Sequence, residues 1–402
     1  MKNLNNGSNQ STIKSNNKSL VLKILNSAGQ SSRAELSRIT GLTKTAITNI
    51  ISELLEEGII FETGTQASSS GRKPILLKIS KNALFSVGVY ISRDFVYTNI
   101  VNLEGEVLKE YKHALDIIEN EKSFLAGIFQ SVDAVLSGFG TEMKKILGIG
   151  VASIGPIDVK NGIILDPPNF RGLKSIHITR ELKERYNLNT YLDNDMNAGA
   201  IAEKLFGKAK NISDFIYLGV TNGVGAGIYI NNSLFRGNDG FAGEIGHTTI
   251  DINGEKCPCG NIGCLELYAS IPAMVNQVKK SIELGAASNV SSDGGILWTD
   301  IIKAAINGDS LCLNIINKLS FYLSVGLVNT INCFDPEVVF IGHEVALAGK
   351  LIVEPLTEMI NRNIFFRNSK KINVEVSDFK NLAAHIGAPS IVLSKYFNGE
   401  IN

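Results

Sequence analysis

Three of the chain's five cysteines and one of its five histidines lie within residues 243–266, GEIGHTTIDINGEKCPCGNIGCLE. These four residues are His247, Cys257, Cys259 and Cys264. One imidazole and three thiolates form a common closed ligand set for structural zinc, which prefers four tetrahedral nitrogen or sulfur donors. The alternative is three core cysteines and an unrelated histidine. Glycines at 260 and 263 let the backbone turn tightly around an ion, so the spacing predicts one zinc ion per chain in a local loop.

Three carboxylates are candidates for binding a polar ligand: two flank this loop, and the third lies about 50 residues before it. Glu244 and Glu266 bracket the expected zinc ligands, and a closed zinc site would leave both free. Asp195 lies in LDNDMNA (192–198), directly after Asn194, where a strand should give way to a helix. Carboxylates flanked by amides suit a hydroxyl-rich ligand, because together they donate and accept hydrogen bonds. The alternative is that these Asn and Asp residues only cap the helix.

The N-terminal fifth of the chain has the pattern of a helix-turn-helix. Residues 1–17 are rich in Asn and Ser, which predicts a disordered tail. Order is expected from about Leu20, in a helix that ends at Gly29. Ser32 and Glu35 form the signature of a capping box at the start of a short helix over 33–39. A turn with Gly41 follows, and Thr43 is placed to cap a second helix.

The second of these helices should face outward with polar residues that can contact base edges and phosphates in a major groove. These residues are Lys44, Thr45, Thr48 and Asn49. Strands over 58–61 and 74–79 with a Ser-rich tip would form a wing, whose base carries Arg72 and Lys73 for phosphate or minor-groove contact. We therefore predict a winged helix that binds double-stranded DNA; the alternative is a small helical module that binds protein.

Charge and composition agree with an intracellular protein that binds DNA through one end. The 402 residues carry no net charge, but residues 1–80 hold ten Lys and Arg against five Asp and Glu. The polar start has no apolar segment of the kind that a signal peptide needs, and no uninterrupted apolar run approaches the roughly 18 residues of a membrane span. Clustered cysteines favour a reducing compartment over a disulfide framework. We expect a cytoplasmic protein without a membrane partner.

The segments RAELSRITGLTKTAITNIISELLEEGII and SSSGRKPILLKI resemble the winged helix of repressors in the ROK family (repressors, open reading frames and sugar kinases). They are most similar to the xylose-repressor branch, and the resemblance covers nearly all residues after about 18. It implies an α/β fold in which an N-terminal winged helix-turn-helix precedes a two-lobed, ribonuclease-H-like body of the actin and sugar-kinase type. The implied divisions are the tail, 1–17, the DNA-binding domain, 18–80, and the sugar-binding body, 84–402. Lobe one is expected over about 84–194 plus about 382–402, and lobe two over about 195–381.

The chain departs from the family's kinases at three elements that the resemblance associates with phosphate or nucleotide. The first hairpin has Tyr90–Asp94, YISRD, where the kinases have a glycine-containing turn. Asn222 stands where they place a Thr that contacts phosphate, and Phe340–Glu344, FIGHE, replaces a Gly-Gly segment. Bulky side chains keep backbone N–H groups away from a phosphate, and Asp94 would repel it. We expect that the protein is not an enzyme.

The resemblance also implies a sugar pocket. Segments 152–158 and 168–170 are similar to pocket segments of the family, which adds Asn169 to the candidates. The expected sugar contacts are Asn169, Asn194, Asp195, Glu244, His247 and Glu266. His247 has two distinct ring nitrogens, so one can bind zinc while the other faces the sugar.

These features together predict a sugar-responsive repressor that binds operator DNA as a homo-oligomer, either a dimer or a tetramer. A monosaccharide, xylose or glucose, would release it from the DNA. The main alternative is an ATP-dependent sugar kinase in which Asp195 is the base. A third possibility keeps DNA binding but makes a protein, such as a phosphotransferase component, the inducer.

Overall fold

The computed structural model describes residues 10–65, 74–115, 120–165, 173–291 and 295–401. The chain forms two compact units. Unit 1 contains residues 1–152, 177–192 and 388–402, and unit 2 contains residues 153–176 and 193–387. Segment 153–176 thus groups with the second unit, which differs from the boundary expected near residue 194. Its strands β8 (Ile157–Asp158) and β9 (Ile163–Ile164) pair with each other, outside the main sheet of unit 1.

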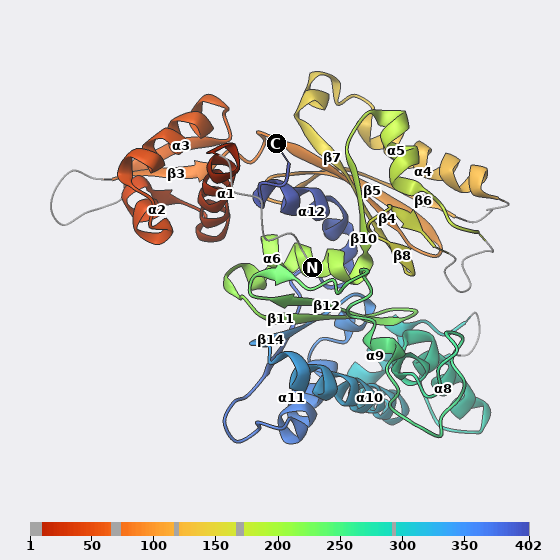
Figure 1. The fold of residues 1–402 in the computed structure, drawn as a ribbon. Helices are drawn as coiled ribbons and strands as arrows, with labels where there is room; N and C mark the ends of the chain where they lie inside the picture. Colours follow the sequence, from red (N-terminus) through yellow and green to blue (C-terminus); the bar gives the residue numbers. More distant parts are fainter. Residues whose placement is uncertain (1–9, 66–73, 116–119, 166–172, 292–294, 402) are drawn as a thin grey trace. The chain divides into compact units, whose positions relative to one another are not determined.

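The N-terminal part of unit 1 is a winged helix-turn-helix, as the sequence predicts (Figure 1). Helices α1 (Gln10–Ala28), α2 (Arg33–Thr40) and α3 (Lys44–Glu56) pack with a sheet of order β1-β3-β2. The sheet consists of β1 (Ser31–Ser32), β2 (Ile60–Thr65) and β3 (Ile75–Ile79). The sequence did not indicate β1, because its two residues form a strand only through pairing with Leu76 and Leu77. The wing tip, residues 66–73, lies outside the described residues.

Local signals set the ends of α2 and α3. The Ser32 hydroxyl accepts the Glu35 N–H, and Gly41 ends α2 with φ 71°, a conformation that glycine adopts without strain. The Thr43 hydroxyl accepts the Ala46 N–H at the start of α3. The capping box is incomplete, since the Glu35 carboxylate accepts from Ser31. The inner face of α3 buries Ile47, Ile50, Ile51 and Leu54, and Leu55 is partly buried.

Helix α1 corrects the expected N-terminal tail. It begins at Gln10, ten residues before the predicted start at Leu20, so residues 10–17 are helical. Its partners are remote in sequence: the Ser15 and Ser19 hydroxyls donate to the carbonyls of Gly399 and Phe397. These carbonyls lie just beyond or at the end of helix α12 (Ala383–Phe397), where a helix leaves carbonyls without internal partners. Composition alone could not reveal such contacts.

The rest of unit 1 is built on a five-stranded sheet of order β10-β7-β4-β5-β6. The predicted meander is β4 (Phe85–Ile91), β5 (Phe95–Asn102) and β6 (Val107–Ala114). Helix α4 (Glu121–Leu136) leads to β7 (Ile146–Ser153), and α5 (Ile178–Tyr186) leads to β10 (Thr190–Asn194). Helix α12 packs closely on this sheet, since a Cβ at Gly150 would lie 2.0 Å from the Ala388 carbonyl oxygen.

Unit 2 contains a second five-stranded sheet, of order β13-β12-β11-β14-β15. Its strands are β11 (Phe215–Val220), β12 (Val224–Ile230), β13 (Ser233–Leu234), β14 (Val338–Gly342) and β15 (Asn373–Val376). Helix α6 (Asp195–Phe206) lies on one face, and α10 (Ser310–Phe334) and α11 (Lys350–Asn363) lie on the other (Figure 1). The remaining helices are α7 (Leu265–Ala269), α8 (Ile271–Glu283) and α9 (Trp298–Ile306). Short 3₁₀ helices span Gly140–Lys145, Lys208–Asn211, Ile245–His247, Glu344–Ala348 and Lys380–Leu382.

Helix α10 is, among the described residues, the one segment long and apolar enough to cross a membrane by length and composition. Half of its most apolar window is buried inside the protein. Core helices of soluble proteins share these properties, and Leu319, Leu323 and Leu327 of α10 belong to the core between the helices and the sheet of unit 2.

Candidate sugar, metal and DNA sites

The four predicted metal ligands meet in one loop of unit 2. Their candidate donor atoms, one each from His247, Cys257, Cys259 and Cys264, all lie within 4.8 Å of one another. The loop is closed by its own backbone, since the Cys257 N–H donates to the Asn261 carbonyl. Gly263 takes φ 62°, and a Cβ there would lie 1.7 Å from the Asp251 carbonyl oxygen. Only glycine fits this crossing of the chain, which brings Cys264 back to the other ligands.

The distances between donors fit a tetrahedral ion. Two sulfurs bound to zinc at about 2.3 Å lie about 3.8 Å apart at the tetrahedral angle. The Cys259 and Cys264 Sγ atoms are 3.7 Å apart, and His247 Nδ1 lies 3.9 Å from Cys257 Sγ. Burial raises the pKa of the Cys264 thiol to about 12. A bound cation would therefore be needed to keep this thiol deprotonated at neutral pH.

The turn from β10 into α6 presents Asn194 and Asp195. Asn194 caps α6, with its Oδ1 accepting the Met196 N–H at 2.8 Å. Asp195 is 4% exposed, and one of its oxygens also accepts the Met196 N–H. Burial, together with the nearby negative charge of Glu244, raises the pKa of Asp195 to about 7. Asn194 is thus a helix cap, as the alternative explanation of this motif predicted, and Asp195 is a buried carboxylate near a second one.

Glu244 and Glu266 extend this group of carboxylates. Glu244 follows Gly243, and its side chain is solvent-accessible. The pKa of Glu244 is nevertheless raised, because desolvation by the surrounding protein and the charge of Glu266 outweigh the lowering effect of His247. Glu266 lies two residues after Cys264, and its Oε2 accepts the Val224 N–H at 3.1 Å. The metal loop and the carboxylates are thus adjacent parts of one site.

Gly155 lies close to two of the candidate sugar-binding side chains. A Cβ at Gly155 would lie 3.5 Å from the Asn194 side-chain nitrogen and 3.8 Å from Glu244 Oε1. The segment after Ala152, expected to line a pocket, therefore lies against Asn194 and Glu244. Asn169 and the neighbouring residues 168 and 170 lie outside the described residues, so the structure does not place the sixth expected contact.

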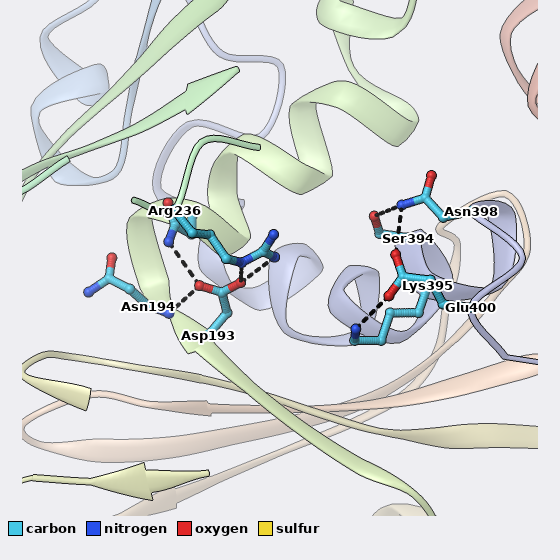
Figure 2. A network of polar contacts seen from close by, with 8 residues as sticks. Asp193, Asn194, Arg236, Ser394, Lys395, Asn398 and Glu400 are labelled. Carbon is cyan, nitrogen blue, oxygen red and sulfur yellow. Dashed lines mark hydrogen bonds and ion pairs between the residues drawn. The ribbon is translucent and has the colours of Figure 1, made fainter. Parts of the chain in front are cut away.

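Two residues of this region were missed by the sequence analysis. Asp193, at the end of β10, is 1% exposed, and Arg236, after β13, forms an ion pair with it at 2.7 Å (Figure 2). A lone Asp at the end of a strand is a weak signal that a cation lies nearby, because buried carboxylates need partners. Nothing in the spacing identifies Arg236, 43 residues further along, as that partner.

The outward face of α3 carries the expected DNA-contacting residues. Lys44, Thr45, Thr48 and Asn49 are all exposed, whereas the isoleucines between and after them are buried. The Thr48 hydroxyl donates to the Lys44 carbonyl at 2.8 Å. Arg72 and Lys73 of the predicted wing lie outside the described residues.

One of the three segments that differ from the family's kinases, 340–344, places a buried histidine after β14. His343 follows β14, is 2% exposed and adopts φ 60°. Its Nδ1 lies 3.0 Å from the hydroxyl of Tyr217, which is on the neighbouring parallel strand β11. Burial lowers the pKa of His343 to about 3, so the ring is neutral. Open α/β sheets bind ligands beyond the carboxyl ends of their parallel strands, and here this buried imidazole follows one of them.

Comparisons with known proteins agree with this arrangement. The ROK family model matches residues 86–395, and a winged helix-turn-helix DNA-binding model matches residues 15–60. The chain is 36% identical to the xylose repressor of Caldicellulosiruptor bescii, over 96% of this chain and 97% of that protein. It is 33% identical to the xylose repressor of Bacillus subtilis, over 97% and 98% of the two chains.

Solved structures give the same result for the fold. A ROK family transcriptional regulator homologous to the Escherichia coli MLC protein superposes with a TM-score of 0.83 at 28% identity, covering 96% of this chain and 97% of that chain. A ROK family glucokinase from Streptomyces griseus, in complex with glucose and AMPPNP, superposes with a TM-score of 0.68 at 26% identity. It covers 76% of this chain and 98% of the glucokinase. These similarities confirm the predicted fold class.

Proposed function

This chain is a member of the ROK family, and from that premise we propose that it is a transcriptional repressor that a monosaccharide releases from operator DNA. The observation that carries the proposal is the combination of two surfaces in one chain. Helix α3 exposes Lys44, Thr45, Thr48 and Asn49, and unit 2 gathers carboxylates and amides suited to sugar hydroxyls. The relatives at 36% and 33% identity are named xylose repressors, so xylose is the first candidate inducer and glucose the second.

The polar group of unit 2 would bind the sugar through hydrogen bonds. The Asn194 amide donates, whereas Asp195, Glu244 and Glu266 accept from hydroxyls. Asn169 would complete the set. The imidazole of His247 would hold the metal through Nδ1, which faces Cys257, and leave Nε2 for the sugar.

The metal in this proposal is zinc, and its role is structural. The donor set of one nitrogen and three sulfurs is closed, so no coordination position remains for a substrate. Zinc would fix the loop between His247 and Cys264 and thereby the two glutamates that flank it.

Release from DNA needs only modest coupling. A sugar that binds the DNA-releasing arrangement of the protein about tenfold better than the DNA-bound one supplies about 1.4 kcal/mol, enough for a tenfold loss of operator affinity. In the proposed complex a homodimer places one α3 helix in each half-site, with Arg72 and Lys73 on the flanking backbone or minor groove. The repressor would act in the cytoplasm.

A sugar kinase is the second candidate, because a carboxylate with a pKa of about 7 suits a general base. The buried imidazole of His343 after β14 supports the repressor, because it lies in segment 340–344, which the family resemblance associates with nucleotide and where the kinases have Gly-Gly. Incubation with Mg-ATP and a panel of sugars decides between them. Sustained phosphorylation that is lost in Asp195→Ala would replace the repressor proposal with the kinase.

The test of the repressor proposal has two stages. Operator sequences are first selected from random DNA by the purified protein, and release is then titrated with pentoses, hexoses and acetylated amino sugars. We expect the protein to select one operator sequence, and we expect xylose or glucose to release it from that DNA at a sugar concentration below saturation. Flat release curves for every sugar would eliminate the sugar as inducer and favour a protein inducer.

A further inference from the structure

The carboxylate of Asp193 is buried directly beneath the turn that carries Asn194 and Asp195. Its Oδ1 accepts the Asn194 N–H at 2.9 Å and the Asn197 side-chain amide at 2.8 Å. Its Oδ2 accepts from Arg236 twice, from Nε at 3.1 Å and from Nη2 at 2.7 Å. A carboxylate has about four acceptor positions, so the bonding capacity of Asp193 is filled.

Arg236 reaches this carboxylate from a different part of unit 2. It follows β13 and begins the loop that ends at Glu244, and its carbonyl accepts the Ala242 N–H at 3.2 Å. Gly243 then crosses β12 so closely that a Cβ would lie 1.9 Å from the Ala226 carbonyl oxygen. The position of Glu244 is therefore set by Arg236 at one end of the loop and by Gly243 at the other.

We propose that Arg236 is a positioning residue for the sugar site, because its ion pair with Asp193 fixes the Asn194–Asp195 turn relative to the loop of Glu244. This inference rests on the proposed function of that site. Figure 2 shows the guanidinium over the Asp193 carboxylate, while the Asn194 side chain points away from both. Arg236 thus acts through Asp193, from the side opposite to the Asn194 amide.

The chemistry of the contact requires arginine. Two donors in a fixed fork occupy both acceptor positions of Oδ2, whereas a lysine ammonium would supply the charge without that fixed geometry. Removing the guanidinium would leave a buried carboxylate uncompensated, and the turn would rearrange to hydrate it. Polar ligands that need Asn194, Asp195 and Glu244 at fixed separations would lose affinity.

Three variants separate positioning from stability: Arg236→Met, Arg236→Lys, and the double variant Asp193→Asn with Arg236→Met, which removes both charges. Arg185→Met is the matched control, because Arg185 also pairs with an aspartate, Asp133, but on the exposed surface of unit 1. Calorimetry measures xylose and glucose affinity, anisotropy measures operator affinity without sugar, and thermal unfolding measures stability.

We expect Arg236→Met to weaken sugar binding by about tenfold or more and Arg236→Lys by about threefold, with sugar-free operator affinity within about twofold of the wild type. The double variant should regain thermal stability but not sugar affinity, as a positioning role demands. Sugar affinity within about twofold of the wild type in Arg236→Met would overturn the proposal. Sugar affinity that recovers together with stability in the double variant would also overturn it, by showing a purely structural role.

Amide hydrogen exchange keeps this test independent of the sugar. Met196 and Ala242 have hydrogen-bonded N–H groups on the two segments that Arg236 joins. Hydrogen exchange at both N–H groups should be faster in sugar-free Arg236→Met and in the double variant than in the wild type. It should be unchanged in Arg185→Met. If the wild type binds no sugar, the proposed function fails while accelerated exchange still supports the positioning role. Unchanged exchange at both segments would refute that role.

Discussion

Replacing Asp195 with asparagine should stabilise the sugar-free protein at alkaline pH and have little effect near pH 4.5. Asp195 is 4% exposed and lies beside the charge of Glu244, and these surroundings raise its pKa from 3.8 to about 7. The folded protein therefore binds this proton more tightly than the unfolded chain does. By linkage, stability falls as the pH rises from about 4 to about 7, and the loss is complete above that range.

The size of the effect follows from the shift. About three pKa units at 1.36 kcal/mol each give an upper limit of about 4 kcal/mol. Hydration and local rearrangement around a charged site reduce such penalties, so we expect a gain of about 1 to 3 kcal/mol for Asp195→Asn at pH 8.5. Asparagine can still accept the Met196 N–H, which keeps the start of α6 intact.

Urea unfolding at pH 4.5, 5.5, 7 and 8.5 measures this gain. Trp298 is the single tryptophan of the chain, is buried and donates to the Glu344 carbonyl, so its fluorescence reports on unit 2. Because the chain has two units, only this transition is compared between variants. The stability difference between Asp195→Asn and the wild type should grow with pH.

Asp309 provides a control of opposite sign. Burial alone would raise its pKa, but hydrogen bonds from Cys312, Asn289 and Ser288 outweigh this and lower the pKa to about 2. Its stabilising effect is present above pH 4, so Asp309→Asn should lose a constant amount, up to about 2 kcal/mol, from pH 5.5 to 8.5. A pH-independent difference for Asp195→Asn, or a loss at pH 8.5, would refute the argument from burial and like charge.

Three further predictions concern the metal loop, the DNA face and the contact between the two ends of the chain. Wild-type protein should contain about one zinc per chain by metal analysis; Cys259→Ser should lose it together with the inducer response, whereas Cys333→Ser, an exposed cysteine outside the cluster, should keep both. Lys44→Ala should weaken binding to all DNA sequences alike and reduce the salt dependence of binding by about one ion, whereas Asn49→Ala should relax specificity at one base pair by about 1 to 3 kcal/mol. Fluorescence anisotropy over a salt series and a set of mutated operators measures both effects. A change of specificity in Lys44→Ala and a uniform loss of affinity in Asn49→Ala would mean that the two roles are exchanged. Ser19→Ala removes the hydroxyl that donates to the Phe397 carbonyl and should cost about 1 kcal/mol of local stability, seen as faster amide exchange in the last turn of α12; equal exchange in both proteins would mean that the contact contributes nothing.

Features encoded by neighbouring residues could be predicted from the sequence. Ser32, Gly41 and Thr43 form hydrogen bonds to residues within about one helical turn along the chain. These contacts set the ends of α2 and α3 as expected. The metal ligands span only 18 residues, with glycines at the crossings, so their meeting in one loop followed from spacing and backbone geometry. The two-lobed body, in contrast, was predicted from family resemblance, since alternating strands and helices indicate only an α/β fold.

Features that depend on distant contacts could not be predicted. Strand β1 exists because Ser31 and Ser32 pair with β3, and the first turns of α1 contact Phe397 and Gly399 at the other end of the chain. The pairing of Asp193 with Arg236 and the burial of His343 against Tyr217 likewise require the folded sheet. Local propensity carries no information about such partners, which tertiary packing selects.

Reciprocal coupling between sugar and operator is the most direct test of the central claim. Operator affinity is measured with and without saturating xylose, and xylose affinity is measured with and without saturating operator, under the same salt conditions. Linkage requires the two factors to be equal. We predict that xylose, or glucose if xylose fails, weakens operator binding by about tenfold or more, and that the operator weakens sugar binding by the same factor. Sugar binding of equal strength on free and operator-bound protein would contradict the account.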